Sequence, residues 1–184
     1  MTSGKEDYLK ALYTLSDSYE IITNKQLADT LQVSPPSVSE MIVKLEKQGY
    51  VEYTAYKGSR MTLKGKSAAA KLIRFHCIWE VFLVEKLNFS WDEVHEIAEE
   101  LEHIQSDKLI ERLDAFLGFP KKDPHGDPIP NKEGVFSTTV QTLLSELKQG
   151  DKGLCAAVKN TSKEFLVYLN KMNIALGDEI EVLS

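Results

Sequence analysis

Residues 23–49 decide the fold of the first part of the chain and read TNKQLADTLQVSPPSVSEMIVKLEKQG. Thr23-Asn24-Lys25-Gln26 is a capping box, in which side chains satisfy the free N–H groups of a helix start, so we predict a short helix through Leu31. Ser34-Pro35-Pro36 is a second helix start, because the first turn tolerates proline. The second helix is amphipathic and ends at Gly49. Two helices joined by a tight turn indicate a helix-turn-helix.

The segments on either side of this pair complete the predicted domain. Lys5 to Ser16 has apolar residues at helical spacing, with Asp7 in its first turn, where the helix dipole favours a carboxylate. After the pair, Tyr50–Tyr53 and Arg60–Leu63 alternate as two strands around a turn. This hairpin is a wing. The recognition helix and the wing both present groups that contact DNA phosphates, namely Ser34, Ser37, Ser39, Lys44, Lys57, Ser59 and Arg60. The pattern predicts a winged-helix DNA-binding domain.

Residues 95–103 read HEIAEELEH. At helical spacing they place several residues of metal-binding types on one helix face. His95, Glu99, Glu102 and His103 share this face, and their carboxylates repel one another unless a cation lies between them. A zinc protease motif is excluded because Glu99 stands where a second His is required. A di-iron bundle needs a second Glu-x-x-His motif, which the chain lacks. A divalent metal site and a solvated acidic face with two incidental histidines both stay open.

A long helical stretch precedes this acidic segment and reaches about Leu87. It has more apolar positions than one face of a surface helix needs, so we expect it to be buried on two sides, as at a dimer interface. His76 and Glu80 form an i, i+4 pair within it. The pair has metal-ligand chemistry, although a partly buried histidine bonded to its helix neighbour fits the pattern as well.

Composition and charge limit the function classes. The net charge is −6, with 42% hydrophobic and 27% charged residues, which is ordinary for a globular protein. Residues 1–75 hold 11 Lys and Arg against 8 Asp and Glu, whereas residues 76–184 hold 11 against 20. Residues 1–75 therefore have the charge balance expected of a polyanion-binding segment, and residues 76–184 that of a cation-binding segment. Without an apolar signal segment or a membrane-span run, and with only Cys77 and Cys155, the chain is expected to be cytoplasmic.

The last third of the sequence has weaker secondary-structure signals. Residues 119–131 form a loop with four prolines that carries Asp123, His125 and Asp127 and has the composition of a linker able to supply one metal ligand. Beyond it we predict strands over residues 135–140, 154–158 and 177–183 and a short helix over residues 163–172.

Taken together, these segments resemble the diphtheria-toxin-repressor family, most closely its manganese-responsive streptococcal and staphylococcal branch. The resemblance is carried by KEDYL from Lys5, VSPPSVSEM from Val33, EVFLV from Glu80, the 94–103 helix, Ser106-Asp107 and the stretch from Gly118 to Gly126. It implies a mainly α protein with a winged helix over residues 1–63, an all-helical dimerisation and metal-binding domain over 64–131, and a linker with part of a small β, SH3-like domain over 132–184.

The resemblance also implies metal and DNA contacts. The primary metal site would consist of Asp7, Glu99, Glu102 and His103. The ancillary site would draw on His76, Glu80 and His95, with Asp123 and His125 as further candidates. Base-reading positions would be Ser34, Pro36 and Glu40. Iron-responsive members have Met and Cys where this chain has Asp7 and Glu99, and such hard oxygen ligands suit Mn²⁺, with Fe²⁺ as the alternative and Zn²⁺ or Co²⁺ as substitutes in vitro.

These expectations lead to one main function and two alternatives. The main one is a dimeric transcriptional repressor of metal-uptake genes that binds palindromic operator DNA with Mn²⁺ or Fe²⁺ as co-repressor. A mononuclear metal hydrolase is the first alternative, but we find no nucleophile or general-base constellation, so no enzyme is expected. The second is a winged-helix interaction protein that senses no metal.

Overall fold

The computed structural model describes residues 3–104, 106–137 and 140–183. It divides into two compact units, the first made of Met1–Arg74 and Pro130–Val135, the second of Phe75–Ile129 and Phe136–Ser184. Within the described residues, no helix is long and apolar enough to cross a membrane.

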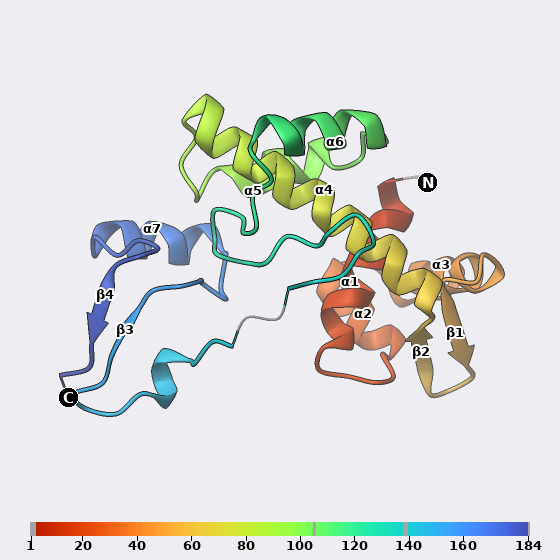
Figure 1. The fold of residues 1–184 in the computed structure, drawn as a ribbon. Coiled ribbons are helices and arrows are strands. Elements are labelled where there is room, and N and C mark those ends of the chain that lie inside the picture. The colour runs from red at the N-terminus through yellow and green to blue at the C-terminus, as the bar shows by residue number, and fades with distance from the viewer. Residues whose placement is uncertain (1–2, 105, 138–139, 184) are drawn as a thin grey trace. The chain divides into compact units, whose positions relative to one another are not determined.

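Three helices precede the wing in the first unit, and the starts of the second and third follow the sequence signals. They are α1 (Ser3–Ser16), α2 (Asn24–Leu31) and α3 (Pro35–Lys47), shown in red and orange in Figure 1. The predicted capping box is confirmed, because the Thr23 side chain accepts from Gln26 N and the Gln26 side chain accepts from Thr23 N. Ser34 caps α3, and prolines fill its first turn. The helix-turn-helix is therefore specified by local chemistry.

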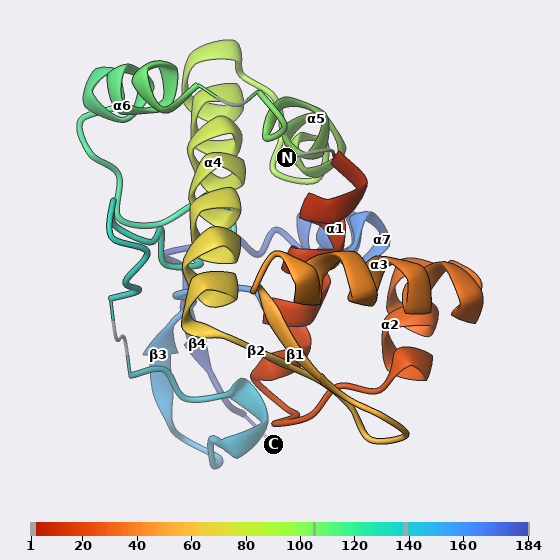
Figure 2. The same ribbon diagram turned by 90° about the vertical axis from the view of Figure 1, so that its right-hand side faces the viewer.

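The predicted wing is also confirmed, although its second strand begins at Gly58 rather than Arg60 and Leu63 already begins the next helix. Strand β1 (Val51–Thr54) pairs antiparallel with β2 (Gly58–Met61), and the hairpin projects from the helices of this unit with its turn at the free end (Figures 1 and 2). Ile22 adds a bridge to Ser59 on the outer edge of β2. Gly58 is required there, because a Cβ would lie 2.4 Å from the Ile22 carbonyl oxygen. The wing is thus fixed to the segment that precedes α2.

An apolar core holds the helices and the wing of the first unit together. Its almost fully buried members come mainly from α1, α2, α3 and β1, with Ile22 from the segment before α2 and Ala69 from the helix after the wing. They include Leu9, Leu12, Leu27, Val38, Ile42, Leu45 and Val51. Burial of each such side chain stabilises the fold by about 1.5–3 kcal/mol. The apolar faces predicted for α1 and α3 are the faces that form this core.

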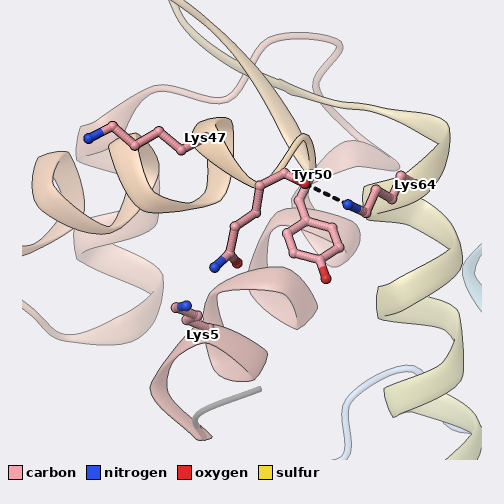
Figure 3. Close-up of a pocket in the computed structure, with 5 residues that line it drawn as sticks. Lys5, Lys47, Tyr50 and Lys64 are labelled. Atoms are coloured by element: carbon pink, nitrogen blue, oxygen red, sulfur yellow. Dashed lines mark hydrogen bonds between the residues drawn. The ribbon is translucent and has the colours of Figure 1, made fainter.

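Helix α4 (Leu63–Leu87) begins in the first unit and ends in the second. Its start is attached to the end of α3: the Lys64 amine donates to the Gln48 carbonyl at 2.7 Å and lies 4.8 Å from the centre of the Tyr50 ring (Figure 3). At Gly65 a Cβ would lie 2.1 Å from the Tyr50 carbonyl oxygen. A larger residue at position 65 would therefore push the helix away from the end of α3.

The second unit adds two shorter helices to the C-terminal half of α4. Helices α5 (Val94–Leu101) and α6 (Asp107–Phe116) lie on different sides of this half (Figures 1 and 2). Ser106 caps α6, since its side chain accepts from Leu109 N. Helix α5 is shorter than expected: it ends at Leu101, so Glu102 is its C-cap residue and His103 lies in the following turn.

The C-terminal segment carries little regular structure. It contains a short 3₁₀ turn (Leu144–Glu146), β3 (Lys152–Leu154), α7 (Lys163–Lys171) and β4 (Glu179–Glu181), with β3 and β4 paired antiparallel. A small core of Val158, Leu166 and Leu169 packs against Trp91. The strand predicted over 135–140 is wrong for residues 135–137 and 140, and residues 138 and 139 lie outside the described residues. The Asn131 side chain accepts from Val135 N instead, which closes a loop.

Candidate metal centre and DNA-binding surface

Glu80 is the centre of a buried cluster in the second unit. Its side chain is only 1% exposed, and three imidazoles surround it. Oε1 lies 2.9 Å from Nε2 of His76 and 3.3 Å from Nδ1 of His95, and Oε2 lies 3.4 Å from Nδ1 of His125. Three histidines on one buried carboxylate form either a set of charged pairs or a metal site.

His76 is held between two carboxylates. Its Nδ1 lies 2.7 Å from Oε2 of Glu102, while its Nε2 faces Glu80. Glu102 is also 1% exposed, although it follows the last residue of α5. A carboxylate that accepts the Nδ1 hydrogen leaves the Nε2 lone pair of the imidazole available to a cation, an arrangement common around metal-binding histidines.

The proline-rich loop brings further ligand types to Glu80. Asp123 Oδ1 accepts from the backbone N–H groups of His125 and Asp127, so the carboxylate shapes the loop that carries it. The thiol of Cys77 donates to Asp123 Oδ2 at 3.5 Å. One ligand atom from each of Glu80, Asp123 and His125 lies within 4.8 Å of the others. The loop is therefore part of the cluster.

The C-terminal segment supports this loop. The His125 carbonyl accepts from Val158 N at 2.9 Å, and Nε2 of His125 pairs with the Trp91 carbonyl at 2.8 Å. Gly126 has φ +91°, and a Cβ there would lie 2.3 Å from the Ala156 carbonyl oxygen. Only glycine allows this close approach, so the position of His125 depends on residues more than thirty positions later in the chain.

The cluster shifts the pKa values of its members in opposite directions. Burial alone would raise the pKa of Glu80, but hydrogen bonds with His125, His76 and His95 outweigh burial and lower it. Hydrogen bonds to Glu80 and Glu99 raise the pKa of His95 from 6.5 to about 9. Burial, reinforced by the charges of Glu80 and Asp127, raises the pKa of Asp123 to about 6. Strongly perturbed groups gathered in one place are typical of a functional site.

The predicted primary site is distributed over both units. Glu102 and His103 lie in the second unit with ligand atoms within 4.8 Å of each other. Glu99 is exposed, and its Oε1 lies 3.4 Å from Nε2 of His95. Asp7 is exposed on α1 and belongs to the first unit. The site made of these four residues stays a prediction.

The predicted DNA-contacting residues are exposed with one exception. On α3 and just before it these are Ser34, Pro36, Ser37, Ser39, Glu40 and Lys44, and on the wing Lys57 and Arg60. Glu40 and Lys44 form an ion pair at 2.6 Å, and Arg60 pairs with Glu20 at 2.6 Å. Ser59 is fully buried. Its side chain therefore faces the inside of the wing, and any role in DNA binding would have to come from its backbone.

Sequence reasoning missed two residues that the structure makes notable. The sequence pattern gives Cys77 no role in a site, yet its thiol donates to Asp123 Oδ2 in the cluster. Its i, i+3 spacing from Glu80 was the available signal. Tyr56 stands fully exposed at the turn of the wing with φ +61°, a conformation that bulky residues rarely adopt. Nothing in the local sequence pattern indicated this backbone state.

Comparisons with known proteins agree with this geometry. Models of the iron dependent repressor family match residues 1–59 as the N-terminal DNA binding domain and residues 62–131 as the metal binding and dimerisation domain. The chain is 30% identical to the diphtheria toxin repressor of Corynebacterium efficiens, over 97% of this chain and 82% of that protein. The chain belongs to the diphtheria-toxin-repressor family. A FeoA domain model also matches residues 142–184.

Two further relatives place the chain within the diphtheria-toxin-repressor family. The iron-dependent repressor IdeR of Mycobacterium leprae is 31% identical over 68% of this chain, which spans about half (54%) of that relative's length. A solved structure of a manganese-dependent transcriptional repressor in complex with manganese is 39% identical, with a TM-score of 0.88, over 98% of this chain and 83% of the other. The mainly α fold with a winged helix and a small C-terminal β segment is therefore confirmed.

Proposed function

We propose that this member of the diphtheria-toxin-repressor family is a metal-dependent transcriptional repressor that binds operator DNA as a homodimer. The observation that carries the proposal is the combination, in one chain, of a winged helix with an exposed recognition helix and a buried cluster of imidazoles and carboxylates. Control of DNA binding by metal accounts for the presence of both the winged helix and the buried cluster in one chain. The manganese and iron repressors among its relatives support the same conclusion.

The proposed DNA contacts come from α3 and the wing. The serines of α3, Lys44, Lys57 and Arg60 would contact phosphates, and the buried Ser59 would do so only through its backbone. Such contacts supply affinity and fix the register on the duplex. Ser34, Pro36 and Glu40 would meet base edges in the major groove. In a dimer, two such helices read half-sites about 34–36 Å apart, so the proposed operator is palindromic.

We propose Asp7, Glu99, Glu102 and His103 as the primary metal ligands and the Glu80 cluster as the ancillary site. Their donors are mainly carboxylate oxygens with imidazole nitrogen, a set that fits divalent cations. A bound divalent ion supplies positive charge that neutralises neighbouring carboxylates. The hard oxygen donors favour Mn²⁺ as the co-repressor, with Fe²⁺ as the alternative. Cys77 is a protonated thiol, because burial and the Asp123 carboxylate raise its pKa well above the ordinary value.

The role of Asp7 explains how metal would control DNA binding. Glu102 and His103 are already positioned within the second unit, whereas Asp7 belongs to the DNA-binding unit. Asp7 joins the second-unit ligands only in those arrangements of the two units that bring them together. Metal then favours these arrangements, and if they also fit the operator, metal and DNA strengthen each other's binding by the same factor.

Substitution of Asp7 tests this proposal. Fluorescence anisotropy of a labelled promoter fragment, at fixed salt and with EDTA, Mn²⁺, Fe²⁺ or Zn²⁺, measures the affinity of each variant. We expect metal to tighten wild-type binding at least tenfold, about 1.4 kcal/mol, and Asp7→Ala to lose this gain while it keeps its fold. Asp17→Ala, an exposed carboxylate just after α1, is the matched control and should behave as wild type. Metal-stimulated binding that survives in Asp7→Ala would refute the proposed ligand role.

The second candidate function is an interaction protein that senses no metal. Equilibrium dialysis against Mn²⁺ separates the two. Saturable binding that is lost in Glu102→Ala or His103→Ala supports the repressor. DNA affinity that is identical with and without metal would leave DNA binding in place and reduce the Glu80 cluster to a structural role.

A further inference from the structure

We propose that the ancillary region of the second unit holds a pair of divalent cations bridged by the carboxylate of Glu80. The starting observation is that two separate groups of three ligand residues share this one side chain: His76, Glu80 and His95 form one, and Glu80, Asp123 and His125 form the other. The inference rests on the proposed function, because it concerns the metal sites of the same regulator. From the sequence, the ancillary site has only a set of candidate ligands, and the number of ions is open.

The two oxygens of Glu80 face different groups. Oε1 is the atom close to His76 and His95, and Oε2 is the atom close to His125. A carboxylate that divides its oxygens in this way bridges two ions with one oxygen for each. With Glu80 1% exposed, the carboxylate has little freedom to turn both oxygens to one side.

The first group already has the dimensions of a coordination site. Nε2 of His76, Nδ1 of His95 and Oε1 of Glu80 form a triangle with edges of 2.9, 3.2 and 3.3 Å. Ligand atoms at about 2.0–2.2 Å from a shared ion and at roughly tetrahedral or octahedral angles lie about 2.9–3.5 Å apart. One ion fits over this triangle with almost no movement of the protein. Glu102 fixes the orientation of the His76 ring from its other side.

The second group approaches Glu80 from the proline-rich loop. Nδ1 of His125 lies 3.4 Å from Oε2, and Asp123 supplies a second carboxylate within the same 4.8 Å set. The loop backbone holds Asp123 Oδ1 through the His125 and Asp127 N–H groups. This leaves Oδ2, which accepts from the weak Cys77 thiol donor, as the oxygen available to an ion.

The number of carboxylates around Glu80 also favours the binding of more than one cation. Glu99 faces His95 and Glu102 faces His76, while Asp127 lies beside Asp123 in the loop. Together with Glu80 and Asp123, this places five carboxylates around three imidazoles. Three of these carboxylates, Glu80, Glu102 and Asp123, are buried, and a buried carboxylate without a compensating charge is costly. Two bridged ions compensate both groups.

Ion stoichiometry in a set of variants tests the pair. The full chain carrying His103→Ala, which removes a primary ligand, is titrated with Mn²⁺ by calorimetry. We expect two ions per chain. Addition of His95→Gln or of Asp123→Asn should leave one ion, and addition of Glu80→Gln should leave none. Glu85→Gln, an exposed carboxylate one turn further along α4, is the matched control and should keep two. Circular dichroism checks that each variant is folded.

Electron paramagnetic resonance gives an independent readout. Two Mn²⁺ ions that share a carboxylate are magnetically coupled, so the hyperfine-split signal of isolated Mn²⁺ should be broadened in the His103→Ala chain and restored by His95→Gln. A single bound ion in His103→Ala, or one ion retained after Glu80→Gln, would overturn the bridged pair. Metal-stimulated DNA binding by the wild-type chain decides the proposed function separately: if it persists while only one ion binds, the pair alone is wrong.

Discussion

Replacement of Glu80 by Gln in the metal-free protein should destabilise the second unit strongly. The substitution keeps the size of the side chain and removes its charge, which three imidazoles face at 2.9, 3.3 and 3.4 Å. Exposed ion pairs contribute about 0–1 kcal/mol, but Glu80 is 1% exposed. Loss of one partner from a buried pair costs about 3–5 kcal/mol, and the Gln amide recovers one hydrogen bond of about 0.5–1.5 kcal/mol. We therefore expect a net loss of about 2–4 kcal/mol near pH 6.

The cost of this substitution should fall as the pH rises. The folded-state pKa of His95, about 9, lies above its unfolded value of 6.5. The stabilisation from its charged pair with Glu80 is therefore complete below about pH 6.5 and is lost as the pH rises through about 9. At high pH the wild type loses this contribution to its stability. Glu80→Gln lacks the Glu80 charge, so it has little of this contribution at any pH. Because the His95 side chain is 44% exposed, we expect the difference to shrink by no more than about 1 kcal/mol near pH 10.

Urea denaturation in EDTA, followed by tryptophan fluorescence, measures this effect. Trp79 and Trp91 both belong to the second unit, so the signal reports the unfolding of that unit. Glu85→Gln is the control on the same helix, where the exposed carboxylate pairs with Lys86 at 3.3 Å. A cost for Glu80→Gln no greater than that of Glu85→Gln would refute the conclusion that Glu80 compensates buried imidazoles.

Three further substitutions test the local structure, each by its effect on the midpoint of thermal or urea unfolding. Thr23→Ala removes the capping box of α2 and should cost about 1 kcal/mol, whereas Thr14→Ala, inside α1, should have a smaller effect. Gly126→Ala should cost about 2–5 kcal/mol, from a strained φ and a Cβ 2.3 Å from the Ala156 oxygen; Gly150→Ala has a similar φ but open space, and should cost only the strain. Tyr56→Asn should stabilise the first unit by up to about 1 kcal/mol, because Asn tolerates the left-handed backbone, and an unchanged midpoint would contradict the strain at this turn.

The sequence predicted the first unit well because its signals are local. The capping residues Thr23 and Ser34, the prolines of α3 and the alternation of the wing act within a few residues of their own positions, and the structure contains each of them. The same holds for the start of α6 at Ser106. Features that depend on neighbours three or four residues away can be derived from a sequence without knowledge of packing.

The metal cluster could be predicted only in part. The i, i+4 spacing placed His76 beside Glu80, but the pairing of His76 with Glu102 joins α4 to the end of α5, and helical periodicity cannot show it. The expected stripe of four ligands on one helix also differs from the structure, because α5 ends at Leu101 and Glu102 turns into the buried cluster. The strand prediction was wrong at residues 135–137 and 140 for a related reason: an apolar pattern is compatible with a loop closed by the Asn131 side chain.

The continuity of α4 links the two halves of the proposed mechanism. Near its start, Lys64 and Gly65 attach it to the end of the recognition helix α3, and His76 and Glu80 lie farther along it in the cluster. The twelve helical steps from Lys64 to His76 span about 18 Å of helix. An unbroken helix of this length transmits a rotation at one end to the other with little loss, because its hydrogen-bonded backbone deforms less easily than a loop. In the proposed mechanism, an ion that draws the ligands around His76 and Glu80 together would therefore act on the same helix whose start is attached to the end of α3.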